Sequence, residues 1–305
     1  MIRIGSAGWS YPDWAGVVYP KDPGAKFDPL KYLASYLDCI EINNSFYRIP
    51  PPGNAVAWVR RVTEQPGFRF TVKLWRGFTH EPDSLTPSGA RDAARAFRDF
   101  LTPLHEEGRL GAVLVQFPYS FHDTGPSRAR LAGLLDRFEA YPLVVELRHG
   151  SWLAGDLLSE LSARGVGFCN VDQPELTANI PPTAHRTSGI GYVRLHGRNA
   201  EAWFSEGAGR DRRYDYLYGA EELAGWVDRI AALSAGAQDV FIIANNHYRG
   251  KGVVNALEIK SAIEKAPVAV PPDLAAAYPR LSGIARPGEP ARQGARPRQG
   301  VLPLS

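Results

Sequence analysis

Charged side chains gather where a short apolar run of this chain ends. In residues 143–148 the apolar run Leu143-Val144-Val145 leads into Glu146, and Arg148 follows two positions later. Side chains alternate along a strand, so Glu146 and Arg148 would share one face of a strand here. Burying such a pair is costly unless the charges neutralise each other or serve a function. A carboxylate held in this setting can act as a general acid or base.

The same pattern recurs at the ends of other apolar runs. Four more runs end in polar–apolar–polar triplets, and two end in amides: Glu41-Ile42-Asn43, Thr71-Val72-Lys73, Asn170-Val171-Asp172, Arg194-Leu195-His196, Gln116 and Asn245-Asn246. The outer residues of each triplet should point the same way, because the side-chain period of a strand is two. We therefore expect one polar cluster, in which the carboxylates of Glu41, Glu146 and Asp172 balance Lys73, Arg148 and Arg194.

This cluster predicts a catalytic site. We expect Glu146 and Asp172 to form the acid–base pair and His196 to carry the proton, because an unperturbed imidazole titrates near pH 6.5. The side chains expected to bind substrate are Trp9, Tyr11, Asn43, Tyr47, Lys73, Gln116, Arg148, Arg194 and Asn245. Aromatic rings above a polar pocket are common where a sugar or a base stacks. The same charges could instead form a structural ion-pair network, with Glu41 and Arg194 as a pair beneath the site.

Eight strand-like runs would position these side chains, and helical patterns alternate with them. The strands are predicted at Ile2–Ser6, Cys39–Asn43, Arg69–Leu74, Ala112–Gln116, Leu143–Leu147, Gly167–Asp172, Gly191–His196 and Asp239–Asn245. The helices are predicted at Pro29–Tyr36, Ala55–Glu64, Gly89–His105, Ser127–Glu139, Leu153–Arg164, Ala220–Ser234 and Val253–Ala266. Residues 179–183 indicate a loop in place of a helix between the sixth and seventh strands.

Such alternation predicts parallel strands joined by right-handed crossovers. Eight units within residues 1–270 predict a single-domain (β/α)8 TIM barrel, which would bring all the polar strand ends to one mouth. A doubly wound open sheet fits less well, because no Gly-rich turn follows the first strand.

The C-terminal extension, residues 271–305, differs from the rest in composition. A short helix is predicted at Asp273–Tyr278, and Pro, Gly, Arg and Gln dominate from Gly283 onward, which indicates disorder. Residues 280–305 hold five Arg and one Glu, a net charge of +4, so the rest of the chain carries −1 of the total +3. The basic balance therefore belongs to the extension, and we do not expect the body to bind nucleic acid.

The predicted compartment is the cytoplasm. Cys39 and Cys169 lie inside apolar runs, as buried free thiols of a reducing compartment do. The chain starts directly with a strand-like run, and no stretch approaches the ~20 apolar residues of a membrane span.

The motifs at the strand ends resemble those of one known family. Gly8-Trp9-Ser10-Tyr11, Glu41-Ile42-Asn43-Asn44-Ser45-Phe46-Tyr47, Gln116-Phe117-Pro118, Glu146-Leu147-Arg148-His149-Gly150-Ser151-Trp152, Arg194-Leu195-His196-Gly197 and Asn245-Asn246 occur in this order. They resemble domain-of-unknown-function family 72, the YecE-like proteins, over about residues 2–265. The resemblance implies a (β/α)8 barrel and implies no reaction.

Three functions remain open on the sequence. The first is a metal-independent and cofactor-independent enzyme, of hydrolase or isomerase/lyase type, using carboxylate acid–base chemistry on an anionic or polyhydroxylated small molecule. The second is a metal-dependent phosphodiesterase or isomerase similar to the endonuclease IV and xylose isomerase barrels, with Glu41, Glu146, Asp172 and His196 as ligands. The third is a barrel that binds a ligand without catalysis.

Overall fold

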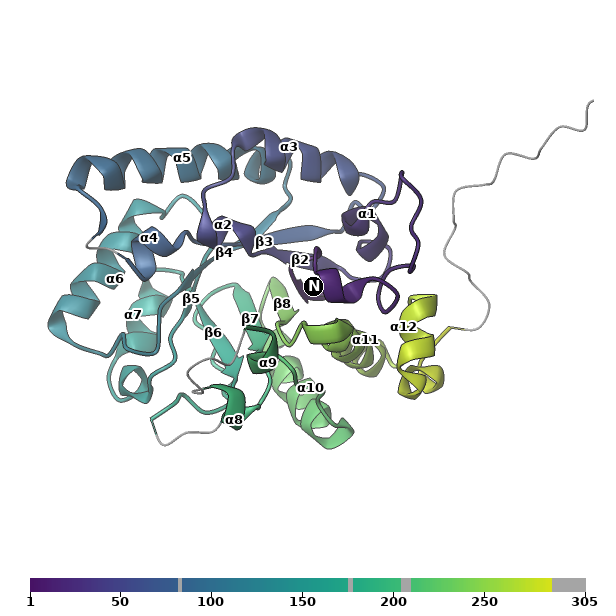
Figure 1. Cartoon of the computed structure of the whole chain (residues 1–305). Coiled ribbons are helices and arrows are strands. Elements are labelled where there is room, and N and C mark those ends of the chain that lie inside the picture. The colour runs from purple at the N-terminus through teal and green to yellow at the C-terminus, as the bar shows by residue number, and fades with distance from the viewer. Residues whose placement is uncertain (82–83, 175–177, 204–209, 287–305) are drawn as a thin grey trace, which may run out of the picture.

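Eight parallel strands form a closed barrel and follow one another in chain order around it (Figure 1). The computed structural model describes residues 1–81, 84–174, 178–203 and 210–286. The strands are β1 (Ile2–Ala7), β2 (Cys39–Ile42), β3 (Arg69–Lys73), β4 (Leu110–Gln116), β5 (Leu143–Glu146), β6 (Gly167–Asp172), β7 (Ile190–Leu195) and β8 (Asp239–Ala244). Pairing of β1 with β8, with Ile4 opposite Ile242, closes the barrel. The predicted (β/α)8 architecture is confirmed.

The longer helices surround the barrel on its outer face, and several short helices lie in the loops that connect strands and helices (Figure 1). They are α1 (Pro29–Leu33), α2 (Asn44–Tyr47), α3 (Pro52–Arg61), α4 (Arg76–Thr79), α5 (Pro87–Glu106), α6 (Gly125–Arg137), α7 (Leu157–Ala163), α8 (Ala200–Trp203), α9 (Arg210–Arg213), α10 (Ala220–Ser234), α11 (Lys251–Glu264) and α12 (Pro272–Ala277). The short 3-10 helices are η1 (Pro12–Trp14), η3 (Gly150–Leu153), η4 (Tyr248–Gly250) and η5 (Pro279–Gly283).

Local sequence explains where the main helices begin. Thr86 precedes α5, and its hydroxyl accepts a hydrogen bond from Gly89 N at 3.1 Å. Proline in the first turn of α3 and α5 lets both helices start earlier than predicted, because a proline there loses no helical hydrogen bond. The helix predicted from Leu153 begins only at Leu157, since η3 occupies the preceding turn. The segment predicted as a loop between β6 and β7 carries no helix within residues 173–174 and 178–189.

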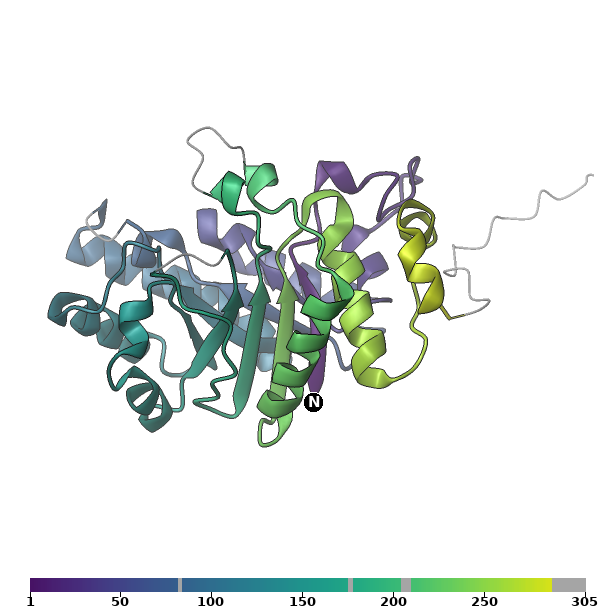
Figure 2. The same ribbon diagram turned by 90° about the horizontal axis from the view of Figure 1, so that it is seen from below.

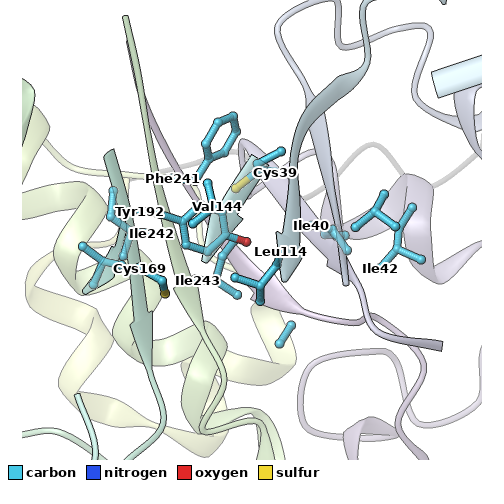
Figure 3. Packing of buried hydrophobic residues seen from close by; sticks show 14 of the residues in the cluster. Cys39, Ile40, Ile42, Leu114, Val144, Cys169, Tyr192, Phe241, Ile242 and Ile243 are labelled. Atoms are coloured by element: carbon cyan, nitrogen blue, oxygen red, sulfur yellow. The ribbon is translucent and has the colours of Figure 1, made fainter. Parts of the chain in front are cut away.

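Apolar side chains fill the barrel below the polar strand ends and the layer between strands and helices (Figure 3). Tyr192 and Phe241 are fully buried on β7 and β8, and their rings lie 6.1 Å apart. Fully burying a large apolar side chain contributes about 1.5–3 kcal/mol relative to exposure. Cys39 and Cys169 are buried free thiols, as predicted, and burial raises the pKa of each well above its usual range. Both thiols are therefore packing groups rather than nucleophiles.

The chain continues as folded structure beyond residue 270. The predicted short helix is present as α12, and the side chains of Leu274 and Leu281 are buried against the barrel. Tyr278 donates a hydrogen bond from its hydroxyl to Arg249 O at 2.7 Å. Disorder is predicted from Gly283 onward, but Ala285 forms a β-bridge with Val268, and Arg286 N donates a hydrogen bond to Val268 O at 2.8 Å, so the prediction is wrong for residues 283–286. Residues 287–305 lie outside the described residues. In the described part of the chain, no helix has both the length and the apolar character that crossing a membrane requires.

The barrel has two distinct ends. Figure 2 shows the strands from the side, with the N-terminus at the lower end and the segment after β7, which contains α8 and α9, above the opposite end. That upper end is the carboxyl end of the parallel strands. Barrel enzymes carry their chemistry there.

Candidate functional site

A pocket of about 410 Å³ opens at the carboxyl end of the barrel. It is lined by Tyr11, Asn43, Phe46, Tyr47, Lys73, Arg76, His80, Gln116, Pro118, Tyr119, Arg148, Arg194, Arg213, Tyr214, Asn245 and His247. Among the described residues that line it there are four Arg and one Lys, but no Asp or Glu. A pocket of this kind attracts negative charge.

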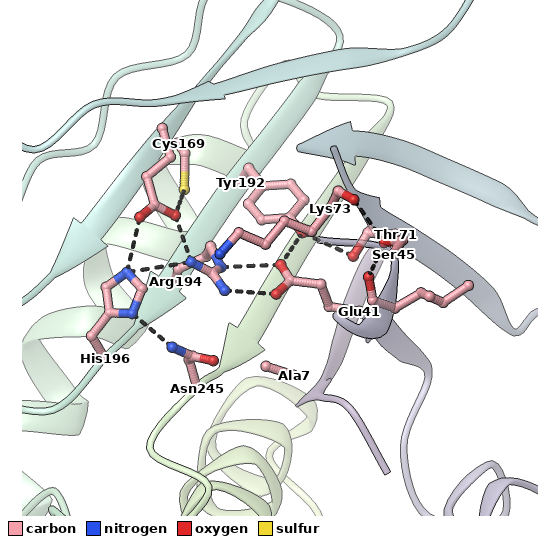
Figure 4. Close-up of polar contacts among 12 residues, drawn as sticks. Ala7, Glu41, Ser45, Thr71, Lys73, Cys169, Tyr192, Arg194, His196 and Asn245 are labelled. Carbon is pink, nitrogen blue, oxygen red and sulfur yellow. Dashed lines mark hydrogen bonds and ion pairs between the residues drawn. The ribbon is translucent and has the colours of Figure 1, made fainter. Parts of the chain in front are cut away.

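Arg194 joins the two carboxylates that lie beneath the pocket (Figure 4). Its guanidinium donates to Glu41 Oε1 at 2.6 Å and Oε2 at 3.0 Å, and to Glu146 Oε2 at 2.6 Å. All three side chains are almost completely buried. This geometry confirms the expected pairing of Glu41 with Arg194 under the site.

Glu146 is enclosed by hydrogen-bond donors. Arg148 Nη2 donates to its Oε1 at 2.9 Å, and His196 Nε2 lies 3.3 Å from the same oxygen. Burial alone would raise the pKa of Glu146, but Arg194, His196 and Arg148 together outweigh it and hold this pKa well below its usual range. Glu146 is therefore a permanent carboxylate that orients Arg148 and Arg194, and it does not line the pocket.

His196 lies in the same cluster as a neutral imidazole. Its Nδ1 accepts a hydrogen bond from the Asn245 amide at 2.9 Å, which leaves Nε2 to carry the proton toward Glu146. Burial is the main cause that lowers the pKa of His196 to about 3. The expectation of a proton carrier that titrates near pH 6.5 is therefore wrong for this side chain.

Asp172 lies outside the cluster, contrary to prediction. Its carboxylate accepts hydrogen bonds from Trp226 Nε1 at 2.6 Å, Tyr218 Oη at 2.9 Å and Arg198 Nη2 at 2.7 Å. Trp226 belongs to α10, so Asp172 faces the helical layer and not the lumen. Cys169 lies on the opposite face of β6 from Asp172. It points inward, with its Sγ 4.0 Å from Glu146 Oε2. No acid–base pair of Glu146 with Asp172 exists in this geometry.

Lys73 ends β3 and reaches into the pocket. Its Nζ lies 3.9 Å from the centre of the Phe46 ring, a cation–π contact. Burial, followed by the charge of Arg194, lowers the pKa of Lys73 to about 7. The Lys73 amine therefore changes protonation near neutral pH.

The lining atoms Asn43 Oδ1 and Arg76 Nε are buried and have no hydrogen-bond partner among the described residues. Buried polar groups are nearly always hydrogen-bonded in proteins, so an atom without a partner in a pocket fits contact with a ligand.

The predicted aromatic platform is only partly present. Tyr11 lines the pocket and stacks on His247 with ring centres 4.3 Å apart, and Tyr47 stands at the rim with 58% of its surface exposed. Trp9 does not line the pocket, because its ring packs edge-on against Trp58 of α3 at 5.3 Å. The remaining residues predicted to bind substrate all line it: Asn43, Lys73, Gln116, Arg148, Arg194 and Asn245.

The family model described as "Protein of unknown function DUF72" matches residues 3–279. The chain belongs to the DUF72 family. The resemblance drawn from the strand-end motifs is confirmed.

Relatives of this DUF72 chain match it along most of its length. The UPF0759 protein YunF of Bacillus subtilis (strain 168) is 30% identical over 274 residues, which cover 87% of this chain and 95% of YunF. A solved DUF72 structure from Thermotoga maritima MSB8 has a TM-score of 0.75 and 33% identity, and covers 87% of this chain and 99% of its own. One from Enterococcus faecalis V583 has a TM-score of 0.76 and 28% identity, and covers 87% of this chain and 96% of its own.

The four candidate metal ligands do not converge in this DUF72 barrel. Glu41 and Glu146 direct their oxygens at Arg194, which occupies the place between them. Asp172 faces the helices, and His196 is turned to Glu146 and Asn245. Within the described residues, no group of three or more His, Cys, Asp or Glu side chains is arranged to hold a metal ion. This geometry does not support the metal-dependent alternative at these residues.

Several lining residues of the DUF72 pocket escaped sequence reasoning. Arg76 follows Lys73 by three positions, and His247 follows Asn245 by two. Both positions lie just past a strand end, so extending the search a few residues into each loop would have found them. Arg213 has no comparable signal, because it comes from α9, far from any strand end.

Proposed function

We propose that this DUF72 barrel is an enzyme that acts on a small anionic molecule bearing a carboxylate or a phosphate. One observation carries the proposal: the lining presents Lys73, Arg76, Arg148, Arg194 and Arg213, and none of the described lining residues is an Asp or a Glu. Arg side chains bind carboxylate and phosphate through paired N–H donors, and these hydrogen bonds are stronger than neutral ones. Tyr11, Tyr47 and the amides of the lining would bind hydroxyl groups of the same molecule.

The proposed chemistry is acid–base catalysis without a metal, and Lys73 carries the proton. A catalytic base works best when its pKa is close to the working pH, and the pKa of Lys73, about 7, meets this condition. Glu146 takes a supporting role, because Arg148, Arg194 and His196 already engage its oxygens. It fixes the direction in which Arg148 and Arg194 present their remaining donors.

Calorimetric titration tests anion recognition directly. Inorganic phosphate and pyruvate should bind, whereas glycerol and acetone should not. Arg148→Met should weaken phosphate binding about tenfold or more, since hydrogen bonds to charged groups contribute roughly 1.5–3 kcal/mol. Arg95→Met is the matched control, because Arg95 is exposed on α5 and far from the pocket. Equal affinity for acetone and pyruvate, or no effect of Arg148→Met, would refute the proposal.

A non-catalytic binding barrel would pass the calorimetric test but fail a test of turnover. Small 2-oxo and 2-hydroxy acids incubated with the protein in deuterated water should exchange carbon-bound hydrogen faster than in buffer alone, as followed by proton NMR. Lys73→Met should abolish the exchange. If anions bind but none of the tested acids exchanges its carbon-bound hydrogen, the non-catalytic alternative is favoured.

We also propose a cytoplasmic location. Cys39 and Cys169 are buried as free thiols, which supports folding in a reducing compartment. Cell fractionation with antibody detection tests this, and recovery outside the cytoplasmic fraction would contradict it.

A further inference from the structure

Lys73 differs from the other lysines of the barrel in its surroundings. Lys251 forms an ion pair with Asp215, and Lys260 Nζ lies 2.6 Å from Asp38 Oδ1, so each of these amines has a carboxylate partner. The Lys73 amine has no carboxylate within ion-pair distance among the described residues and packs on the face of Phe46 instead. A half-buried amine without a counter-ion is a poor structural cation.

Charged groups from every side of the pocket face this amine. They are Glu41 of β2, Arg76 and His80 from α4 and its C-terminal end, Glu146 and Arg148 at the end of β5, and Arg194 of β7. Burial is the main cause that lowers the pKa of Lys73, and Arg194 and Arg148 lower it further while the two carboxylates oppose them. Figure 4 shows the Lys73 side chain beside Arg194. The amine is therefore neutral in a much larger fraction of molecules near pH 7 than an ordinary lysine is.

A neutral amine beside fixed cations is the arrangement that proteins use to activate lysine as a nucleophile. The cations that keep Lys73 neutral are also the donors that would hold an anionic substrate. A carboxylate or phosphate bound by Arg148 or Arg194 would bring its own carbonyl group into the same pocket of about 410 Å³.

We propose that Lys73 forms a covalent imine with the carbonyl carbon of a small anionic aldehyde or ketone. The inference rests on the proposed function and names its substrate class. The Nζ lone pair attacks the carbonyl carbon, a C–N bond forms, and the C=O π electrons move to oxygen. The carbonyl oxygen and the two amine hydrogens then leave as one water molecule, which completes the C=N bond. Once protonated, the imine draws electrons from the adjacent carbon, so a water molecule in the pocket can take up a proton from that carbon. Lys73 is then the imine nitrogen, and it regains its role as a free amine only when water hydrolyses the imine.

Reductive trapping tests this step in the intact chain. The protein is incubated with pyruvate and cyanoborohydride, which reduces a protonated imine to a stable amine, and the modified lysine is located by peptide mass mapping. Lys73 should be modified at least tenfold faster than Lys31, an exposed lysine on α1 that pairs with Glu64. Lys73→Arg should remove this adduct and keep the charge, whereas Lys31→Arg should leave it unchanged. Circular dichroism of Lys73→Arg checks that the variant is folded.

Two further measurements separate this inference from anion recognition. Acetone has a methyl group in place of the carboxylate of pyruvate. The rate at which it modifies Lys73, divided by the rate at which it modifies a free lysine derivative, should be much lower than the same ratio for pyruvate. Inorganic phosphate should protect Lys73. Calorimetric binding of phosphate without faster modification of Lys73 would overturn the imine and leave the proposed function intact. Fast modification with acetone and pyruvate alike, without protection by phosphate, would overturn anion recognition and, with it, the substrate class named here.

Discussion

Replacing Arg194 with Met tests whether one guanidinium holds the polar cluster together. Arg194 makes hydrogen bonds of 2.6, 3.0 and 2.6 Å to Glu41 and Glu146, and neither carboxylate is exposed. In the variant, Glu146 keeps Arg148 and His196, whereas Glu41 keeps, among hydrogen bonds to described residues, only that from the Tyr192 hydroxyl at 3.0 Å. Removing one partner of a buried ion pair typically costs about 3–5 kcal/mol, because a charge remains buried without compensation.

The free energy of unfolding, measured by urea denaturation at pH 7, should fall by this amount in Arg194→Met. Glu41→Gln combined with Arg194→Met should recover roughly 2 kcal/mol, a coupling that a double-mutant cycle measures. Lys31→Met, which removes the exposed pair with Glu64, should cost no more than about 1 kcal/mol.

Two results would refute this reasoning. One is a loss below about 1 kcal/mol for Arg194→Met, which would mean that buried carboxylates tolerate the missing cation. The other is a double variant no more stable than Arg194→Met, which would mean that lost packing, and not the uncompensated charge of Glu41, causes the deficit.

Three further predictions follow from buried groups. The pKa of His196 is about 3 in the folded protein and near 6.5 in the unfolded chain, so between these pH values only the unfolded chain takes up the proton. The free energy of unfolding should therefore fall by about 1.4 kcal/mol for each pH unit below pH 6.5. His196→Gln should remove this slope in urea denaturation at several pH values, and an unchanged slope would contradict the prediction. Because the pKa of Lys73 is lowered to about 7, the unfolded state binds the extra proton up to about pH 10, so Lys73→Met should raise the free energy of unfolding at pH 7 by roughly 2–4 kcal/mol, with the gain vanishing at high pH. Asp172→Asn should lower the free energy of unfolding by about 2–4 kcal/mol, because it weakens the hydrogen bonds to Trp226 and Arg198. The affinity for phosphate, measured by calorimetry, should change by no more than about twofold. A large loss of affinity would show that Asp172 contributes to the binding site after all.

The sequence alone determined the barrel and most of its polar mouth. Strand period and β-branched content are local properties, so the eight runs and their order could be read directly. Parallel strands in a closed barrel bring their carboxyl ends together, which placed Asn43, Lys73, Arg148 and Arg194 around one pocket without knowledge of any contact.

Only the tertiary structure decided the phase of β6 and the state of each charged group. A two-residue period fixes alternation but not which face is the lumen, and both faces of β6 offer apolar residues. Asp172 faces outward because Trp226 and Tyr218, about fifty residues further along the chain, supply donors in the helical layer. Likewise, Glu146 is an anion, His196 a neutral imidazole and Lys73 a partly neutral amine. Burial and the charged side chains nearby set these protonation states. Because those side chains are far apart in the sequence, they become neighbours only in the folded barrel.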